Sequence, residues 1–154
     1  MINTTRCHAL GFAKRTSKNL GYIEDAFKKD ADVHVITQPA NSLLGLIVFP
    51  WEKHFVDAIE ENRLDDLTNK PWPKWTTTKG TSDTLGQLVE NLRHFVAHGN
   101  MRFSSDSRQL DEVNIEVENY KPRTTTLIWS ASISAKDLRK FCVRFIKLIE
   151  ETIG

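Results

Sequence analysis

The chain has 154 residues, with 21 Lys and Arg against 20 Asp and Glu, so its formal net charge is +1. Hydrophobic residues make up 40% and charged residues 27%, which excludes wholesale disorder and predicts a single domain over residues 1–154. The near-neutral balance also excludes a protein that coats nucleic acid through bulk positive charge. Any nucleic-acid site must therefore be local, or be built by more than one copy of the chain.

Cysteine usage and the apolar runs indicate where the protein resides. Cys7 and Cys142 form no C-x-x-C pattern, so we expect free thiols in a reducing cytosol. Residues 1–9 are polar and lack the apolar region of a signal peptide. The longest apolar run, residues 43–51, is too short to span a bilayer. These features predict a cytoplasmic protein that makes no membrane contact.

Apolar periodicity predicts two helices in the first third of the chain. The first covers about residues 9–30, where one face carries apolar side chains at i, i+3 and i+7: Leu20, Ile23 and Phe27. The second covers about residues 32–48. Pro39 either kinks this helix or marks its true start, with Asn41 or Ser42 as the N-cap.

Residues 62–80 are predicted to form a connecting loop. It contains prolines and tryptophans among polar residues: Pro71, Trp72, Pro73 and Trp75. An aromatic cluster of this kind can stack nucleobases. A loop packed onto the core by its tryptophans is the favoured interpretation.

The clearest element is a helix over residues 82–98. Its apolar stripe follows the i, i+3, i+4, i+7 pattern throughout: Leu85, Leu88, Val89, Leu92, Phe95 and Val96. Capping side chains are available from Thr81, Ser82 and Asp83. Gly99 follows the helix directly, where a left-handed C-cap is expected.

A β-hairpin and a last helix are predicted for the rest of the chain. A polar loop over 104–112 precedes an alternating strand over 113–118 and a β-branched strand over 124–133. Residues 134–137 resemble a capping box that opens the last helix. The apolar stripe of that helix comprises Leu138, Phe141, Cys142, Phe145, Leu148 and Ile149. The predicted fold is mainly α, with the hairpin inserted before the last helix.

His94 and His98 lie four residues apart on the 82–98 helix, so both rings point the same way and can share a metal ion. No Glu occupies the H-E-x-x-H position and no third ligand is apparent nearby, which favours an accidental pair on a polar face. We therefore expect neither a metal nor a cofactor. The sequence also contains no G-x-S-x-G elbow, no P-loop and no G-x-G-x-x-G motif.

The segment from Arg93 to Asn100 holds residue types suited to RNA cleavage without a metal. A histidine takes or gives a proton near neutral pH, and an arginine binds phosphate through two parallel donors. RNA supplies its own nucleophile, the 2′-hydroxyl, so cleavage needs a base, an acid and positive charge on the developing phosphorane. The two histidines and the arginine of this segment can supply all three.

Helical geometry requires more than one straight helix for this chemistry. At about 100° per residue, Arg93 and His98 lie about 140° apart around the axis, and His94 lies opposite the core. Unwinding at Gly99 can bring His98 round, or a second copy of the helix can complete the site. The exposed, weakly charged face also suits packing against a two-fold mate.

This arrangement resembles the HEPN (higher eukaryotes and prokaryotes nucleotide-binding) superfamily. Its hallmark is an Arg, four to six residues and then a His late in a helix, with Asn, Asp or His after the Arg; Arg93, His94 and His98 match it. The helix order resembles a four-to-five-helix up-down HEPN bundle over nearly the whole chain, with the β-hairpin as an insertion. Residues 41–51 and 97–100 are similar to small plasmid- and genome-island-borne HEPN proteins.

The resemblance implies a metal-independent endoribonuclease that leaves 2′,3′-cyclic phosphate ends, serves as a toxin or antiphage effector, and forms its site at a homodimer interface. Arg93 would neutralise the scissile phosphate, His98 would move the proton, and His94 would support the phosphate or orient His98. Weaker candidates for RNA contact are Asn100, Arg102 and Asn41. A cognate antitoxin is a possible partner, but Asn100 stands where many paired toxins carry a modified Tyr, which puts regulation by that modification in doubt.

Two alternatives stay open at the level of sequence. The chain can be a non-catalytic HEPN-like dimer that binds RNA, a nucleotide or a protein, with Arg93 paired to a carboxylate such as Glu90 and His98 capping the helix C-terminus. It can also be an enzyme that uses His94 and His98 with a metal. RNA binding without turnover would favour the first, and loss of activity in chelator would favour the second.

Overall fold

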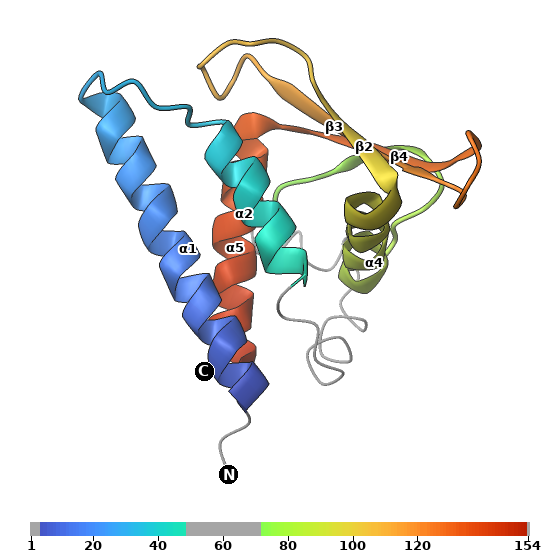
Figure 1. The fold of residues 1–154 in the computed structure, drawn as a ribbon, viewed down its shortest axis with the longest axis horizontal. Helices are drawn as coiled ribbons and strands as arrows, with labels where there is room; N and C mark the ends of the chain where they lie inside the picture. Colours follow the sequence, from blue (N-terminus) through green and yellow to red (C-terminus); the bar gives the residue numbers. More distant parts are fainter. Residues whose placement is uncertain (1–3, 49–71, 154) are drawn as a thin grey trace.

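The computed structural model describes residues 4–48 and 72–153, in which helices lie on one side of an antiparallel sheet. The helices are α1 (Thr4–Lys28), α2 (Thr37–Val48), α4 (Leu85–His98) and α5 (Ala135–Ile153). The strands are β1 (Thr76–Lys79), β2 (Gly99–Phe103), β3 (Asn114–Tyr120) and β4 (Leu127–Ser134). Helices α1, α2 and α5 stand side by side with the sheet across one end, and α4 lies beneath the strands (Figure 1).

The predicted mainly-α, up-down bundle is wrong, because the described residues form helices together with a four-stranded antiparallel sheet, which is an α+β arrangement. The predicted hairpin is present as β3 and β4, but it forms the centre of a four-stranded sheet with the order β1-β4-β3-β2. Strand β1 pairs antiparallel with β4, and β2 pairs antiparallel with β3. The two outer strands have 4 and 5 residues, too few for a periodic signal to distinguish them from loop.

The first two helices differ from the prediction in their boundaries. Helix α1 begins earlier, at Thr4, and α2 begins later, at Thr37. Pro39 therefore lies in the first turn of α2, where its missing N–H removes no intrahelical hydrogen bond. Of the two alternatives for Pro39, a kink or the start of the helix, the structure shows the start. Neither Asn41 nor Ser42 is the cap, because both lie inside the helix.

Helix α5 is the central helix of the fold, and it packs against both α1 and α2. The hydroxyl of Ser134 accepts a 3.1 Å hydrogen bond from the main-chain N–H of Asp137, which confirms the predicted cap. The predicted apolar stripe is also confirmed. Its members are buried, except for the half-buried Leu148: Leu138, Phe141, Cys142, Phe145 and Ile149.

Trp72 and Trp75 pack edge-on against Phe141, with ring centroids 5.5 and 5.8 Å from the phenyl ring. These two tryptophans therefore belong to the core, as the favoured interpretation holds, and the remainder of that predicted loop, residues 62–71, lies outside the described part. Among the described helices, none combines the length and the apolar character needed to cross a membrane.

Candidate functional site

Helix α4 carries the predicted motif, and its first turn is anchored to the sheet. The hydroxyl of Thr84 accepts the N–H of Gln87 at 3.1 Å, so Thr84 is the N-cap in place of the three residues before it. Ser82 has a different role: its hydroxyl accepts a 2.9 Å hydrogen bond from the indole N–H of Trp129 in β4. The start of α4 is thereby tied to the centre of the sheet.

The second half of α4 is held against β3. The amide of Asn119 donates a 2.7 Å hydrogen bond to the main-chain carbonyl of Asn91. At the helix end, Gly99 has φ −114° and ψ −171°, so the expected left-handed C-cap is wrong and the chain passes directly into β2. A Cβ on Gly99 would lie 2.0 Å from the carbonyl oxygen of Glu118. Glycine is needed here because the helix end approaches the neighbouring strand too closely for any side chain.

The motif side chains lie along the last turns of α4. Arg93 is half-buried, and burial lowers the pKa of its guanidinium from the usual value, while the Glu90 carboxylate raises it in part. The group still carries its charge at neutral pH. His94 is exposed, with its Nε2 atom 4.0 Å from Oε1 of Glu90. His98, the last residue of the helix, is exposed as well.

The geometry of α4 determines whether the side chains of Arg93 and His98 can reach the same phosphate. The helix stays α-helical to His98, so the unwinding at Gly99 that would bring His98 round does not occur. Arg93 and His98 therefore leave the helix about 140° apart around its axis. A single copy of α4 directs its arginine and its last histidine toward different regions of space.

Asn100 and Arg102 lie in β2, at alternate positions opposite Glu118 and Glu116 of β3. They project from the face of the sheet that faces away from the described helices. Arg102 is paired with both carboxylates: its Nε lies 3.8 Å from Oε2 of Glu116, and its Nη2 contacts Oε1 of Glu118. Two acidic partners offset its charge, which makes Arg102 a poorer phosphate ligand than its residue type suggests.

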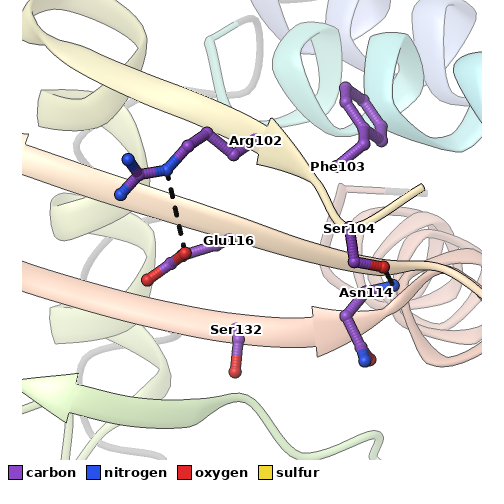
Figure 2. A pocket seen from close by; sticks show the side chains of 6 residues that line it. All are labelled: Arg102, Phe103, Ser104, Asn114, Glu116 and Ser132. Atoms are coloured by element: carbon purple, nitrogen blue, oxygen red, sulfur yellow. Dashed lines mark hydrogen bonds and ion pairs between the residues drawn. The ribbon is translucent and has the colours of Figure 1, made fainter. Parts of the chain in front are cut away.

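A cavity of about 390 Å³ opens on this face, and Figure 2 shows the side chains that line it. It is lined by one aromatic residue and five polar or charged residues: Phe103, Arg102, Ser104, Asn114, Glu116 and Ser132. Arg102 and Glu116 point toward each other in its wall, and Ser132 projects from the adjacent strand (Figure 2). The cavity offers hydrogen-bond donors and acceptors with no unopposed positive charge, so it suits a neutral polar group better than a phosphate.

Glu118, on the same face, is a buried residue that sequence reasoning did not single out. The alternation of β3 suggests a solvent-facing carboxylate, yet Glu118 is only 5% exposed. The hydroxyl of Tyr120 donates a 2.6 Å hydrogen bond to its Oε2 atom. This hydrogen bond, together with burial, raises the pKa of the Tyr120 hydroxyl, and Arg102 and Asn100 lower it in part. The alternating pattern cannot reveal this, because neighbouring polar side chains, not a helix, cover Glu118.

The last candidate, Asn41, is exposed on α2 and lies on a different helix from the motif. Within residues 4–48 and 72–153, no group of three or more His, Cys, Asp or Glu side chains is arranged to hold a metal ion. The His94–His98 pair therefore has no third protein ligand in the described part of the chain.

Helix α4 carries an arginine and two exposed histidines, which is compatible with the HEPN resemblance. A comparison with protein families tests whether the chain belongs to that superfamily. The model of the family described as HEPN pEK499 p136 matches residues 1–154, the whole sequence. The chain belongs to this HEPN family, which confirms the resemblance at the level of the superfamily. Membership indicates a ribonuclease- or nucleotide-related function. No curated protein and no solved structure matches the chain.

Proposed function

We propose that the protein is a metal-independent endoribonuclease whose active site forms between the α4 helices of two copies. The observation that carries the proposal is that the half-buried Arg93 and the exposed His94 and His98 share one helix, which a buried hydrogen bond ties to the sheet. Membership of a HEPN family supports an RNA-related activity. A rigid support matters because catalytic groups must be held in place before the reaction begins.

The proposed reaction uses the RNA's own 2′-hydroxyl. One His98 takes the proton from that hydroxyl, and the 2′-oxygen attacks the adjacent phosphorus. The bond between phosphorus and the 5′-oxygen breaks, and a second histidine donates a proton to the leaving oxygen. Arg93 offsets the negative charge that develops on the phosphorane oxygens. The products are a 2′,3′-cyclic phosphate and a 5′-hydroxyl.

A homodimer is part of the proposal because one α4 directs Arg93 and His98 apart. A two-fold mate can place the His98 of one copy opposite the Arg93 of the other. The surface between them is suited to contact, since Val96 is 40% exposed and Ala97 beside it is exposed too. In this arrangement the apolar side chains of the last turn pack at the interface and the charged groups line a groove.

The biological setting we propose is that of a toxin or antiphage effector, with a cognate antitoxin as a possible partner. Uncontrolled RNA cleavage inside a cell stops growth. We therefore expect induced expression of the wild-type chain to arrest growth, and His98→Ala to relieve the arrest at equal expression. Arrest by both proteins would contradict this setting.

One observation favours a second candidate, a non-catalytic dimer that binds RNA, a nucleotide or a protein. Glu90 lies 4.0 Å from His94 and also raises the pKa of Arg93 in part. Such a carboxylate can hold both side chains in a structural role. In this alternative the protein binds RNA and leaves it intact.

Cleavage of a labelled RNA in EDTA tests the two candidates. We expect the wild-type protein to release cyclic-phosphate ends, and His98→Ala or Arg93→Ala to be slower by at least about 100-fold. His34→Ala removes an exposed histidine outside α4 and serves as the matched control, with unchanged activity. Binding without cleavage by the wild-type protein would establish the second candidate, and cleavage that stops only in EDTA would indicate a metal enzyme.

Mixing two inactive variants tests whether the site is shared. If Arg93 and His98 act from different copies, a mixture of Arg93→Ala and His98→Ala regains part of the activity after subunit exchange. Each variant alone stays inactive. A mixture that remains inactive while forming mixed dimers would argue that one copy supplies both groups.

A further inference from the structure

A second cavity, of about 350 Å³, opens between the C-terminal end of α1 and the N-terminal end of α5. None of the described residues that line it belongs to α4, so it is separate from the proposed active site. Its apolar part is formed by Phe27, Val35 and Leu110. The volume lies within the range of small-ligand sites in proteins.

Three lysines line the same cavity: Lys28, Lys136 and Lys140. Lys28 lies 4.0 Å from Asp25, and Lys140 lies 3.7 Å from Asp137, but all four side chains are at least 43% exposed. Ion pairs this exposed contribute little, so both lysines can turn toward a ligand at small cost. In the described part of the chain, Lys136 has no ion-pair partner.

The charged residues that line the cavity are mostly basic: Lys28, Lys136, Arg139 and Lys140 against Glu24. Helices α1 and α5 together carry ten Lys and Arg residues against five Asp and Glu, whereas the whole chain has a net charge of only +1. The remaining segments are therefore acidic. A local excess of positive charge around a cavity attracts anions and raises their concentration at its mouth.

Contacts with neighbouring side chains hold two residues of the lining, Phe27 and Arg139, in place. Arg108 donates hydrogen bonds of 2.6 and 3.2 Å to the carbonyl oxygens of Val33 and Ala31, and its guanidinium lies 5.6 Å from the centre of the Phe27 ring. Two other lining residues, Arg139 and Glu24, pair with each other. When side chains are already held in place, ordering them on ligand binding costs little free energy.

The helix end itself is not the anion site. The first main-chain N–H groups of α5 already donate hydrogen bonds: Ala135 to the carbonyl of Val113, Lys136 to the carbonyl of Leu110, and Asp137 to the Ser134 hydroxyl. Binding of an anion must therefore come from the lysine side chains. Three ammonium groups match a doubly charged phosphate better than a single carboxylate.

We propose that this cavity binds a small phosphate monoester whose organic part is aromatic or apolar. The phosphate would be held by Lys28, Lys136 and Lys140, and the organic part would rest against Phe27, Val35 and Leu110. This goes beyond the proposed nuclease activity, because it assigns a ligand to a site that shares no residue with the motif.

Calorimetric titration of the full-length protein with two probes, phenyl phosphate and adenosine 5′-monophosphate, tests the proposal. We expect a Kd of about 1 mM or lower for at least one ester, and binding at least tenfold weaker for adenosine and for inorganic phosphate. Absence of binding by both esters at ten times that concentration would overturn the proposal. Equal binding of adenosine would also overturn it, because the phosphate would then be irrelevant.

Variants locate the binding site. Lys136→Ala combined with Lys140→Ala should weaken binding of the ester at least tenfold, while Lys147→Ala, an exposed lysine of α5 outside the cavity, should leave it unchanged. Arg93→Ala and His98→Ala should bind the ester as the wild type does, whether or not the nuclease proposal holds. Binding that survives loss of both lysines, or is lost in the motif variants, would overturn the assignment.

The ester can come from a free metabolite or from the 5′ end of an RNA. A 5′-phosphorylated trinucleotide that displaces phenyl phosphate as well as adenosine 5′-monophosphate does would support the RNA end. Displacement by the mononucleotide alone would support a free small molecule. Both results agree with the proposed ligand chemistry and differ only in its source.

Discussion

The side-chain amide of Asn119 in β3 donates a 2.7 Å hydrogen bond to the main-chain carbonyl of Asn91, two residues before Arg93 in α4. Asn119 is only 1% exposed, so this is a buried connection between the sheet and the motif helix. Asn119→Ala should lower the free energy of unfolding by about 1–3 kcal/mol. Urea denaturation measures the loss. Asn114→Ala, an exposed position in the same strand, should stay within about 0.5 kcal/mol of the wild type; equal effects would contradict the structural role.

Gly99 allows α4 to end against β3, and replacing it should be costly. In Gly99→Ala the new methyl group would lie 2.0 Å from the carbonyl oxygen of Glu118, so the end of the helix must move. The free energy of unfolding should therefore fall by about 1–3 kcal/mol. Gly21→Ala is the matched control, because a Cβ there meets nothing within 4 Å. It should gain about 0.5–1 kcal/mol as a helix-interior glycine replaced by alanine. Thermal unfolding of both variants checks the opposite signs.

The hydrogen bond from Tyr120 to Glu118 raises the pKa of the tyrosine hydroxyl. Glu118→Gln keeps an acceptor but removes the negative charge, so the Tyr120 pKa should fall toward its usual value. Ultraviolet titration in a Tyr22→Phe background isolates this one tyrosine, because the chain has two. Glu116→Gln, in the same strand, should leave the tyrosine pKa unchanged. A tyrosine pKa that does not move in Glu118→Gln would contradict the pairing.

Burial raises the pKa of the Cys142 thiol from 9.0 to about 12. The unfolded chain therefore loses this proton at a lower pH than the folded chain, and the folded state binds more protons between the two values. Stability should fall as pH rises through that window, with a contribution of at most about 1.4 kcal/mol per pH unit. Denaturation from pH 8 to 11 should show a smaller pH slope for Cys142→Ala. Parallel slopes would show that the thiol ionises equally in both states.

The helices that rely on local pattern were predictable from the sequence. Helix α4 has one uninterrupted apolar stripe, and α5 adds a serine cap that the structure contains at Ser134. The HEPN resemblance depends on the same region and is confirmed by the family match. The roles of Arg93, His94 and His98 stay predictions, since they concern chemistry that only cleavage experiments test.

The sheet was only half predictable. The β3–β4 hairpin joins neighbouring segments of the chain. Its two strands have 7 and 8 residues, and each carries apolar side chains at every second position along most of its length. Strand β1 pairs instead with residues more than fifty positions away, as Thr76 opposite Ser132. A four-residue strand whose partner is so distant carries no local signal, because its hydrogen bonds exist only once the chain has folded.

The sequence by itself determined the amphipathic helices, the hairpin and the family, because each depends on residues that are neighbours along the chain. Only the tertiary structure decided that Gly99 is extended, that Arg102 is occupied by two carboxylates, and that Glu118 is buried. It alone brought the lysines of α1 and α5 around one cavity. These features arise from contacts between distant segments, and such contacts depend on how the helices and strands pack.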